Sequence, residues 1–311
     1  MKIVFLDSAT MGDCPLDSIA ALGEFVCYKT STAEEARKRA APADVVILNK
    51  VIVDQAFLDA APGLKLICEA GTGINNIDTA LCDMRGVAVR NVAGYSTDSV
   101  AQITWMHILN LAGMAFHYNS YAKDGRYTAS GIHVDAGHPF TELARKMLGI
   151  VGMGAIGRKV ASIAEDFGMK VIYYSTSGTS HCKRYPSVSL EELISISDVV
   201  SIHAPYNGRT AGLIDYELLK KMRPTAFLVN TGRGGIVAEA DLARAIDEEL
   251  LAGAALDVYE KEPLPSGHPY LVSRHPERIL LTPHIAWYSR ESRQRLAEAI
   301  AENIRSFFVY L

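Results

Sequence analysis

The chain has 311 residues, 49% of them hydrophobic and 21% charged, and it carries a formal net charge of −4. These values are typical of a globular protein with room for two domains, and they exclude an intrinsically disordered chain. Because a slightly negative protein has no electrostatic means of attracting nucleic acid, we expect no nucleic-acid partner.

The sequence carries no targeting or cross-linking signal. The N-terminal segment MKIVFLDSAT lacks the long apolar region of a signal peptide, and no apolar run reaches the roughly 18 residues of a membrane span. The five cysteines show no CxxC spacing, which favours reduced thiols over a disulfide framework or a zinc site. We therefore expect a cytoplasmic protein with no membrane partner and no bound metal.

Strands and helices are predicted to alternate from the N-terminus onward. Short apolar or β-branched runs predict strands at residues 2–7, 25–30, 44–49, 64–70 and 87–91. Helical stretches lie between several of them, and one begins with Thr32 three residues before Glu35, which is the spacing of a capping box. This alternation predicts a parallel sheet that is covered on both faces.

The middle of the chain interrupts this rhythm. Residues 96–119 are apolar most of the way round a helical projection, which predicts one long helix buried between layers. Residues 119–145 are polar, contain glycine and have weak periodicity. A loop of this length in a compact chain is usually functional or an arm for interaction, and we expect it to serve dimerisation.

A second strand–helix series follows the arm. Strands are predicted at residues 147–154, 170–175, 198–205, 226–232, 253–259 and 278–284. Six strands with helices between most of them match a doubly wound dinucleotide-binding fold. The last stretch, residues 289–311, is predicted to be an amphipathic helix.

The segment VGMGAIGRKV, which begins at Val151, contains the glycine pattern of a dinucleotide-binding turn. Gly152 permits a tight turn, Gly154 leaves room for a pyrophosphate against backbone N–H groups, and Gly157 lets the following helix pack close to its strand. The N-terminus of that helix, with Ala155 and Ile156, favours the negative phosphates.

The residue expected to contact the ribose does not follow the usual pattern. Ser175 stands at the end of the next strand, where an Asp or Glu would bind the ribose hydroxyls and repel a 2′-phosphate. Lys183 and Arg184 follow, either as phosphate-binding cations or as solvated charges. The sequence therefore predicts NAD or NADP and leaves the choice open.

Polar side chains follow the later strands of this series. Arg233, Asp257 and His284 each come after a predicted strand, and Glu262 lies five residues beyond Asp257. In such folds the carboxyl ends of the strands form the edge at which ligands bind.

Four motifs together, VGMGAIG, NTGRGG, GAALDVYEKEP and TPHIAWYSRES, resemble the D-isomer-specific 2-hydroxyacid dehydrogenases over nearly the whole chain. The resemblance implies that Arg233, Glu262 and His284 form the catalytic set. It implies an α/β fold of two Rossmann-like, doubly wound domains. A flavodoxin-like substrate domain would comprise residues 1–97 and 285–311, and an NAD(P)-binding domain would comprise residues 98–284.

The chemistry of these residue types agrees with that reaction. Reduction of a 2-keto acid needs a hydride at C2 and a proton at the oxygen, and a histidine suits proton delivery near neutral pH. A carboxylate such as Glu262 would favour the protonated imidazole of His284. The guanidinium of Arg233 can hold the substrate bidentately and offset charge on its oxygen.

The resemblance also implies binding residues. Cofactor contacts are expected from Thr97, Ser175, His203, Pro205, Thr210, Thr231, Gly232, Asp257 and Ala286, besides the glycine turn and the catalytic residues Arg233 and His284. Asp257 would hold the nicotinamide carboxamide, or would cap the following turn. Gly71, Thr72 and Gly73 would receive the substrate carboxylate on backbone N–H groups, aided by Lys50, or would be an ordinary turn capped by Asn75 or Asn76.

The motifs GTGINNID, GYSTDSVAQ and HIAWYSRES are most similar to the glycerate dehydrogenase, or hydroxypyruvate reductase, branch. We therefore expect hydroxypyruvate or glyoxylate as the substrate, and a homodimer. The alternatives are a broad-range 2-keto acid reductase, a formate dehydrogenase, whose pattern has Gln at the position of Glu262, and a non-catalytic, dinucleotide-sensing protein similar to the corepressors of this fold.

Overall fold

The computed structural model describes residues 1–179 and 182–309. The chain forms two compact units. Unit 1 comprises Met1–Ser96 and Tyr288–Leu311, and unit 2 comprises Thr97–Trp287. The chain thus leaves unit 1 after Ser96, builds unit 2 and returns at Tyr288.

Unit 1 is built on a five-stranded parallel sheet in the order β2-β1-β3-β4-β5. The strands are β1 (Lys2–Phe5), β2 (Glu24–Cys27), β3 (Val45–Leu48), β4 (Leu66–Glu69) and β5 (Ala88–Arg90). Every residue of β3 and β4 is buried, as expected for central strands covered on both faces. The strand order is that of the flavodoxin-like fold, so the predicted fold class is confirmed.

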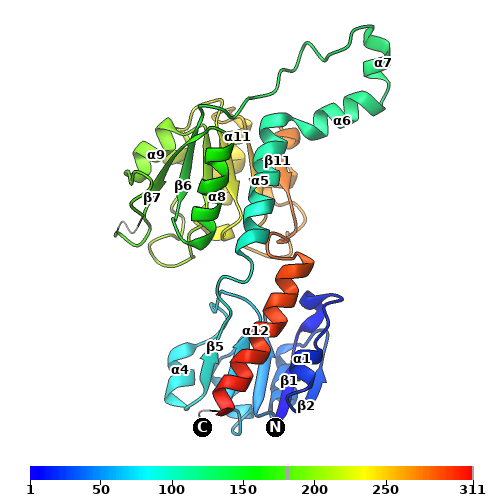
Figure 1. Cartoon of the computed structure of the whole chain (residues 1–311), viewed down its shortest axis with the longest axis vertical. Coiled ribbons are helices and arrows are strands. Elements are labelled where there is room, and N and C mark those ends of the chain that lie inside the picture. The colour runs from blue at the N-terminus through cyan, green and yellow to red at the C-terminus, as the bar shows by residue number, and fades with distance from the viewer. Residues whose placement is uncertain (180–181, 310–311) are drawn as a thin grey trace. The chain divides into compact units, whose positions relative to one another are not determined.

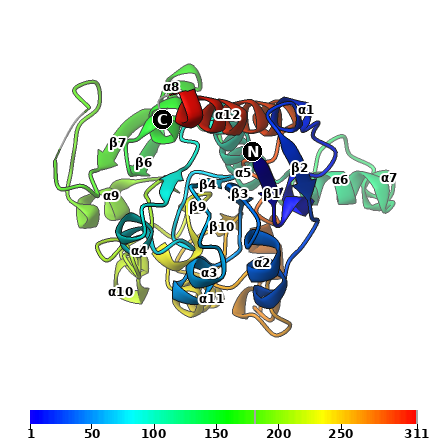
Figure 2. The ribbon, with the colours of Figure 1, turned by 90° about the horizontal axis from the view of Figure 1, so that it is seen from below.

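Helices cover both faces of this sheet (Figure 2). They are α1 (Asp17–Ala20), α2 (Ala33–Ala40), α3 (Gln55–Ala60), α4 (Thr79–Met84) and α12 (Arg290–Val309). The C-terminal helix α12 packs beside α1 and on β4, while α2 and α3 lie against the opposite face. The capping box of α2 is confirmed, because Thr32 accepts a bond from the Glu35 N–H and Glu35 accepts one from the Thr32 N–H.

Unit 2 contains a six-stranded parallel sheet in the order β11-β10-β9-β8-β6-β7. The strands are β6 (Met147–Val151), β7 (Lys170–Tyr174), β8 (Val199–Ile202), β9 (Phe227–Asn230), β10 (Gly253–Leu256) and β11 (Ile279–Leu281). A parallel bridge from Tyr173 to Ser187 extends the sheet beyond β7. The strand order reverses between β6 and β8, and ligands of doubly wound folds bind at that point.

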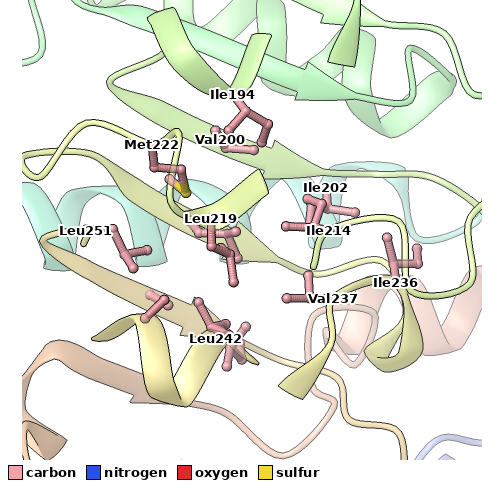
Figure 3. Close-up of a cluster of buried hydrophobic side chains, with 14 of the residues drawn as sticks. Ile194, Val200, Ile202, Ile214, Leu219, Met222, Ile236, Val237, Leu242 and Leu251 are labelled. Atoms are coloured by element: carbon pink, nitrogen blue, oxygen red, sulfur yellow. The ribbon is translucent and has the colours of Figure 1, made fainter. Parts of the chain in front are cut away.

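Two apolar cores hold the helices of unit 2 to its sheet. The helices are α5 (Thr97–Gly113), α8 (Ala155–Asp166), α9 (Leu190–Ile196), α10 (Tyr216–Leu219) and α11 (Glu239–Asp247). On one face α5 and α8 pack around Trp105 and Val160. On the other, α9, α10 and α11 contribute Ile194, Leu219 and Leu242 to the core drawn in Figure 3. Short 3-10 helices complete the chain: η1 (Ser8–Met11), η2 (Gly234–Ile236), η3 (Pro269–Leu271) and η4 (Pro276–Arg278).

The long helix predicted at residues 96–119 is broken in two, so that prediction was wrong. Met114 adopts the left-handed conformation with φ of +50°, which ends α5 at Gly113 and starts α6 (Ala115–Lys123) in a new direction. The polar segment expected to be a loop also contains α7 (Arg126–Ser130). Residues 115–140, called the arm below, extend beyond the sheet of unit 2 (Figure 1), and neither arm helix has a fully buried side chain.

Within the described ranges, no helix combines the length and apolar character needed to cross a membrane. The five cysteines are free thiols in the structure. Burial raises the pKa of Cys68 in β4 to about 12, so this thiol is a packing group and not a nucleophile.

Replacing Ile300 of α12 with alanine tests the assignment of this helix to unit 1. Ile300 is fully buried, so the variant should lose about 2–5 kcal/mol of unfolding free energy. Glu298→Ala, on the exposed side of the same helix, is the control and should change little. Guanidinium unfolding followed by far-UV circular dichroism measures both, and a parental midpoint in the Ile300 variant would contradict the assignment.

Candidate active site

The glycine turn between β6 and α8 has the geometry that its sequence predicts. Gly152 has φ of +95°, and a Cβ on it would lie 2.9 Å from the backbone nitrogen of Ala204 in the loop after β8. A Cβ on Gly157 would lie 2.3 Å from the carbonyl oxygen of Gly152. Only glycine therefore permits the close approach of α8 to its turn and of the turn to the neighbouring strand.

The same turn leaves an open anion site. A Cβ on Gly154 would meet no atom within 4 Å, and Gly154 caps α8 without any side-chain hydrogen bond. The first N–H groups of a helix carry partial positive charge, and they normally receive a capping oxygen. The exposed Ala155 and half-buried Ile156 follow directly. The residues present thus fit the pyrophosphate of a dinucleotide.

Ser175 begins a polar loop at the end of β7. Its hydroxyl donates to the carbonyl of Thr179 at 2.6 Å and lies 3.1 Å from the hydroxyl of Ser177. Arg184, one of the two cations considered for a 2′-phosphate, is paired with Glu165. Arg209, which sequence reasoning missed, instead reaches this loop and donates to the carbonyl of Ser177 at 3.1 Å.

The loop after β8 contains three expected cofactor residues. His203 Nε2 forms a hydrogen bond with Ser201 Oγ at 2.9 Å. Burial lowers the pKa of His203 to about 3, so its ring is neutral. Pro205 is exposed. Thr210 is fully buried and donates to the carbonyl of Pro205 at 2.6 Å, while its oxygen accepts from the Asn207 N–H. Thr210 therefore shapes the loop from within and does not present its own side chain to a ligand.

Arg233 lies in the turn after β9, and it is half-buried. Asn230, which sequence reasoning missed, fixes this turn by donating to the Arg233 carbonyl and accepting from the Gly232 N–H, at 2.9 and 3.0 Å. A Cβ on Gly234 would lie 1.9 Å from the carbonyl carbon of Tyr259, so the Arg233 turn packs directly on the loop after β10. The buried Thr231 shares a hydrogen bond with Thr104 and is thus also an internal residue.

Glu262 and His284 form a hydrogen-bonded pair. Glu262 Oε2 lies 2.7 Å from His284 Nδ1, and each side chain is 26% exposed. The other carboxylate oxygen of Glu262 accepts the Tyr259 N–H at 3.2 Å, which orients the side chain. Because Nδ1 is bound to Glu262, Nε2 is the ring nitrogen left to act on a substrate.

Asp257 fixes the turn that carries His284. His284 has φ of +54°, a left-handed conformation that is uncommon for a residue other than glycine. The fully buried Asp257 accepts bonds from the Thr282 hydroxyl at 2.6 Å and from the N–H groups of Ile285 and Ala286 at 2.9 and 2.8 Å. These contacts fix the turn of His284, and not the turn that directly follows Asp257, which was the cap considered from the sequence.

Burial raises the pKa of Asp257, and the three donors counteract that shift. His107 of α5 extends the network, with its Nε2 3.1 Å from the Thr282 hydroxyl. The Thr282 hydroxyl donates its hydrogen to Asp257, so in its contact with His107 it is the acceptor. Burial lowers the pKa of His107 to about 4. A neutral histidine with its proton on Nε2 therefore completes the support of the His284 turn.

A second buried pair supports the loop of Glu262. Glu239, at the start of α11, accepts the Glu260 N–H at 2.8 Å and lies 2.7 Å from His268 Nε2. His268 Nδ1 accepts the Tyr270 N–H, so Nε2 carries the proton that goes to Glu239. Neither residue was predicted. Their signal in the sequence is only an acidic residue at a helix start and a histidine in a polar segment.

The expected substrate residues belong to unit 1. Gly71 is buried, Gly73 is half-buried, and Thr72 is exposed with its hydroxyl donating to the Val92 carbonyl at 2.9 Å. Lys50 is exposed, and its backbone N–H donates to Asp7, a buried carboxylate that also accepts from the neighbouring N–H groups.

The cap considered for the turn after Gly73 was wrong. Asp78, and neither Asn75 nor Asn76, caps α4, by accepting the Leu81 N–H at 3.0 Å. Asn76 instead donates to Glu69 and to the Val51 carbonyl.

Among the expected cofactor residues, Thr97 begins α5 and is half-buried. Ala286 is 2% exposed; its N–H donates to Asp257, and its carbonyl accepts from the Ser99 hydroxyl at 2.6 Å. Both backbone polar groups of Ala286 are thus hydrogen-bonded within unit 2. Like Thr210 and Thr231, Ala286 is a buried residue that stabilises the loops of the site.

The sequence and the fold resemble those of known proteins. Residues 105–286 match the family model of the D-isomer-specific 2-hydroxyacid dehydrogenase, NAD-binding domain. A hydroxypyruvate reductase from Blautia hydrogenotrophica is 32% identical over 317 residues, which cover 99% of this chain and 97% of that protein.

Two solved structures resemble the whole chain. A D-lactate dehydrogenase from Aquifex aeolicus in complex with NAD and lactic acid has a TM-score of 0.86 at 27% identity, with 99% of this chain and 96% of that chain covered. An acyclic imino acid reductase in complex with NADPH and D-Arg has a TM-score of 0.88 at 27% identity, with 100% and 98% covered. The chain therefore belongs to the D-isomer-specific 2-hydroxyacid dehydrogenase family, and it is an NAD- or NADP-dependent oxidoreductase that acts on 2-hydroxy acids.

Proposed function

We propose that the protein reduces a small 2-keto acid to the D-2-hydroxy acid, with hydroxypyruvate or glyoxylate as the preferred substrate. The observation that carries this proposal is the 2.7 Å contact of Glu262 with His284 Nδ1, on the same sheet edge as Arg233. A proton donor, its carboxylate partner and a guanidinium are the groups that reduction of a 2-keto acid requires of a protein.

We assign the dinucleotide to the carboxyl edge of the unit 2 sheet, where strand order reverses between β6 and β8. The N–H groups at the start of α8 bind the pyrophosphate beside Gly154. Further contacts are assigned to Thr97, Ala155, Ile156, Ser175, Pro205, Gly232 and the backbone of His203. When bound, the nicotinamide supplies the hydride that reaches C2 of the keto acid.

His284 supplies the proton. Its Nε2 donates to the ketone oxygen, and Glu262 stabilises the imidazolium and fixes the orientation of the ring. The two groups thus act as one acid, in which the carboxylate orients the imidazole. In the oxidative direction the same Nε2 accepts the hydroxyl proton.

Arg233 binds the substrate. Its guanidinium offers parallel N–H donors to the carboxylate and the ketone oxygen, and it offsets the negative charge that develops on that oxygen during hydride transfer. In unit 1 we assign the substrate carboxylate to the backbone N–H groups of Gly71, Thr72 and Gly73, with Lys50 as a cation near that loop.

The substrate class follows from what the motifs favour. The sequence has the pattern of the hydroxypyruvate reductase branch, and a relative of that name aligns over nearly the whole chain. Glu262 stands where the formate dehydrogenase pattern has glutamine, so we do not favour that reaction. There are two alternatives: a broader range of 2-keto acids, and a dinucleotide-sensing role without catalysis. The presence of Arg233, Glu262 and His284 together argues against the dinucleotide-sensing role.

We also propose that the protein is a homodimer. Phe116, Ile132, Val134 and Phe140 in the arm are 48–64% exposed, although large apolar side chains gain about 1.5–3 kcal/mol each from full burial. A second copy of the chain is the partner that we propose for this surface.

Replacing His284 with asparagine tests the proton donor. Asparagine tolerates the left-handed backbone of this position but cannot donate a mobile proton, so kcat should fall by about 10²–10⁴-fold. Nicotinamide absorbance after addition of hydroxypyruvate measures kcat, and quenching of protein fluorescence measures cofactor affinity, which should stay near the parental value. Activity within a few fold of the parent would show that another group delivers the proton.

Replacing Ser175 with aspartate tests cofactor choice. We propose that the protein accepts NADPH, because no carboxylate stands at Ser175 to repel a 2′-phosphate and Arg209 reaches the same loop. Aspartate should lower kcat/KM for NADPH by at least about tenfold, equivalent to roughly 1.4 kcal/mol, while NADH is retained or improved. If the ratio of kcat/KM for NADPH to kcat/KM for NADH is the same in the variant and the parent, the ribose does not bind beside residue 175.

Replacing Glu239 with alanine tests the support of the Glu262 loop. The Glu260 N–H and His268 would lose their acceptor, and the displacement of Glu262 should lower kcat between about tenfold and a hundredfold. Glu239→Gln keeps an acceptor for the Glu260 N–H but turns its amide N–H₂ toward the protonated Nε2 of His268, so its kcat should lie between those of the parent and the alanine variant. Steady-state kinetics with cofactor titration separates a kcat effect from weaker cofactor binding; a parental kcat in the alanine variant would refute the positioning role.

A further inference from the structure

A second cluster of side chains with metal-binding chemistry lies in the arm, away from the catalytic residues in sequence and on a different element of unit 2. His117 is on α6, and Asp135 and His138 are in the segment that follows α7. The chain returns on itself after α7, and the Tyr118 hydroxyl donates to the carbonyl of His138. Residues 18 and 21 positions from His117 are thereby brought beside the start of α6.

The three side chains converge on one point. Asp135 Oδ2 lies 2.7 Å from His117 Nε2 and 3.1 Å from His138 Nδ1, and one ligand atom from each residue lies within 4.8 Å of the other two. Zinc bonds to nitrogen and carboxylate oxygen are about 2.0–2.2 Å long, so tetrahedral ligand atoms lie roughly 3.4 Å apart. An ion is accommodated when the His117–Asp135 contact opens by roughly 0.7 Å and the ligand atoms that lie farther apart, within 4.8 Å of one another, close toward the same spacing.

The cluster is held in place by its surroundings. The side chain of Asp135 is only 10% exposed, although the arm around it is largely open to solvent, and its Oδ1 accepts the Gly137 N–H at 3.3 Å. The ring of His117 stacks on Tyr121 at a centroid distance of 6.1 Å and meets the ring of His138 at 4.4 Å. Tyr118, Tyr121, Tyr127, Pro139 and Phe140 line the pocket in which Asp135 and His138 lie.

The electrostatics of Asp135 point to a cation. In the described ranges, its ion pairs are with these two histidines, and no lysine or arginine lies within ion-pair distance of its carboxylate. Arg126, the nearest cation in the arm sequence, is paired with Asp124.

We propose that His117, Asp135 and His138 bind a zinc ion, with water at a fourth position. Two imidazoles and one carboxylate suit Zn²⁺, whereas Mg²⁺ and Ca²⁺ prefer sites built of oxygen alone. The ion would join the first turn of α6 to the returning segment and close a loop across the tip of the arm. Its role is structural, and it is separate from the proposed hydride transfer.

Zinc binding to the full-length chain tests the proposal. After treatment with a chelator and dialysis, isothermal titration with ZnCl₂ should give one ion per chain at this site. Asp135→Asn and His138→Gln should each weaken that binding by at least about tenfold. His133→Gln is the matched control, because His133 lines the same pocket but does not belong to the three-residue cluster. Equal affinity in all four proteins would overturn the proposal.

Cobalt distinguishes this site from the free cysteines. Co²⁺ bound by nitrogen and oxygen gives visible ligand-field bands without the near-ultraviolet charge-transfer band of a thiolate ligand. We expect the parent to show the first pattern and Asp135→Asn to lose it. A thiolate band in the parent that survives in Asp135→Asn would assign the metal to cysteine and refute the proposal.

Protection from trypsin provides a readout that is independent of enzyme activity. Lys123 and Arg126 lie between the ligands in sequence and are exposed cleavage sites. Zinc should slow cleavage there in the parent and in His133→Gln, but not in Asp135→Asn or His138→Gln. Circular dichroism verifies that each variant is folded, and equal protection of parent and ligand variants by zinc would contradict the loop closure.

Discussion

The buried carboxylate of Asp257 is the interaction on which the proposed chemistry depends. The left-handed conformation of His284 costs backbone free energy. The turn persists because the Asp257 carboxyl group accepts hydrogen bonds from the Ile285 and Ala286 N–H groups and from the Thr282 hydroxyl together. Burial raises the pKa of Asp257, and the three donors oppose that shift only in part. Because Asp257 fixes the backbone of the turn, the contribution of Glu262 is to orient the imidazole ring of His284.

The carboxyl edge of the sheet in unit 2 is compact because its loops meet through glycine. Gly152 meets the loop after β8, and Gly234 meets the loop after β10 at distances that exclude a Cβ. Parallel strands bring their ends to one edge, and these contacts then lock four successive loops into a single rigid layer. Arg233 and Glu262 thereby acquire fixed positions from elements that are far apart in sequence.

Much of this arrangement was predictable from sequence, because strands, glycine turns and residues at strand ends have local signatures. The two parallel-sheet α/β folds followed from repeated alternation and from the family resemblance. The break at Met114 was missed, since no local breaker other than Gly113 marks it. The expectation of no metal came from cysteine patterns and linear spacing, whereas the His117 cluster forms only when the arm folds back. The Glu239–His268 support was missed for the same reason, as it joins residues 29 positions apart.

The central claim is that Glu262 and His284 act as one acid. The most direct test is a double-mutant cycle on kcat/KM for hydroxypyruvate, with Glu262→Gln, His284→Asn and the double variant. If Glu262 acts only through the histidine, the second substitution should cause almost no further loss in a protein that already lacks His284. If the fold loss of kcat/KM in the double variant equals the product of the two single losses, the two residues act independently. That result would contradict the claim that they act as one acid.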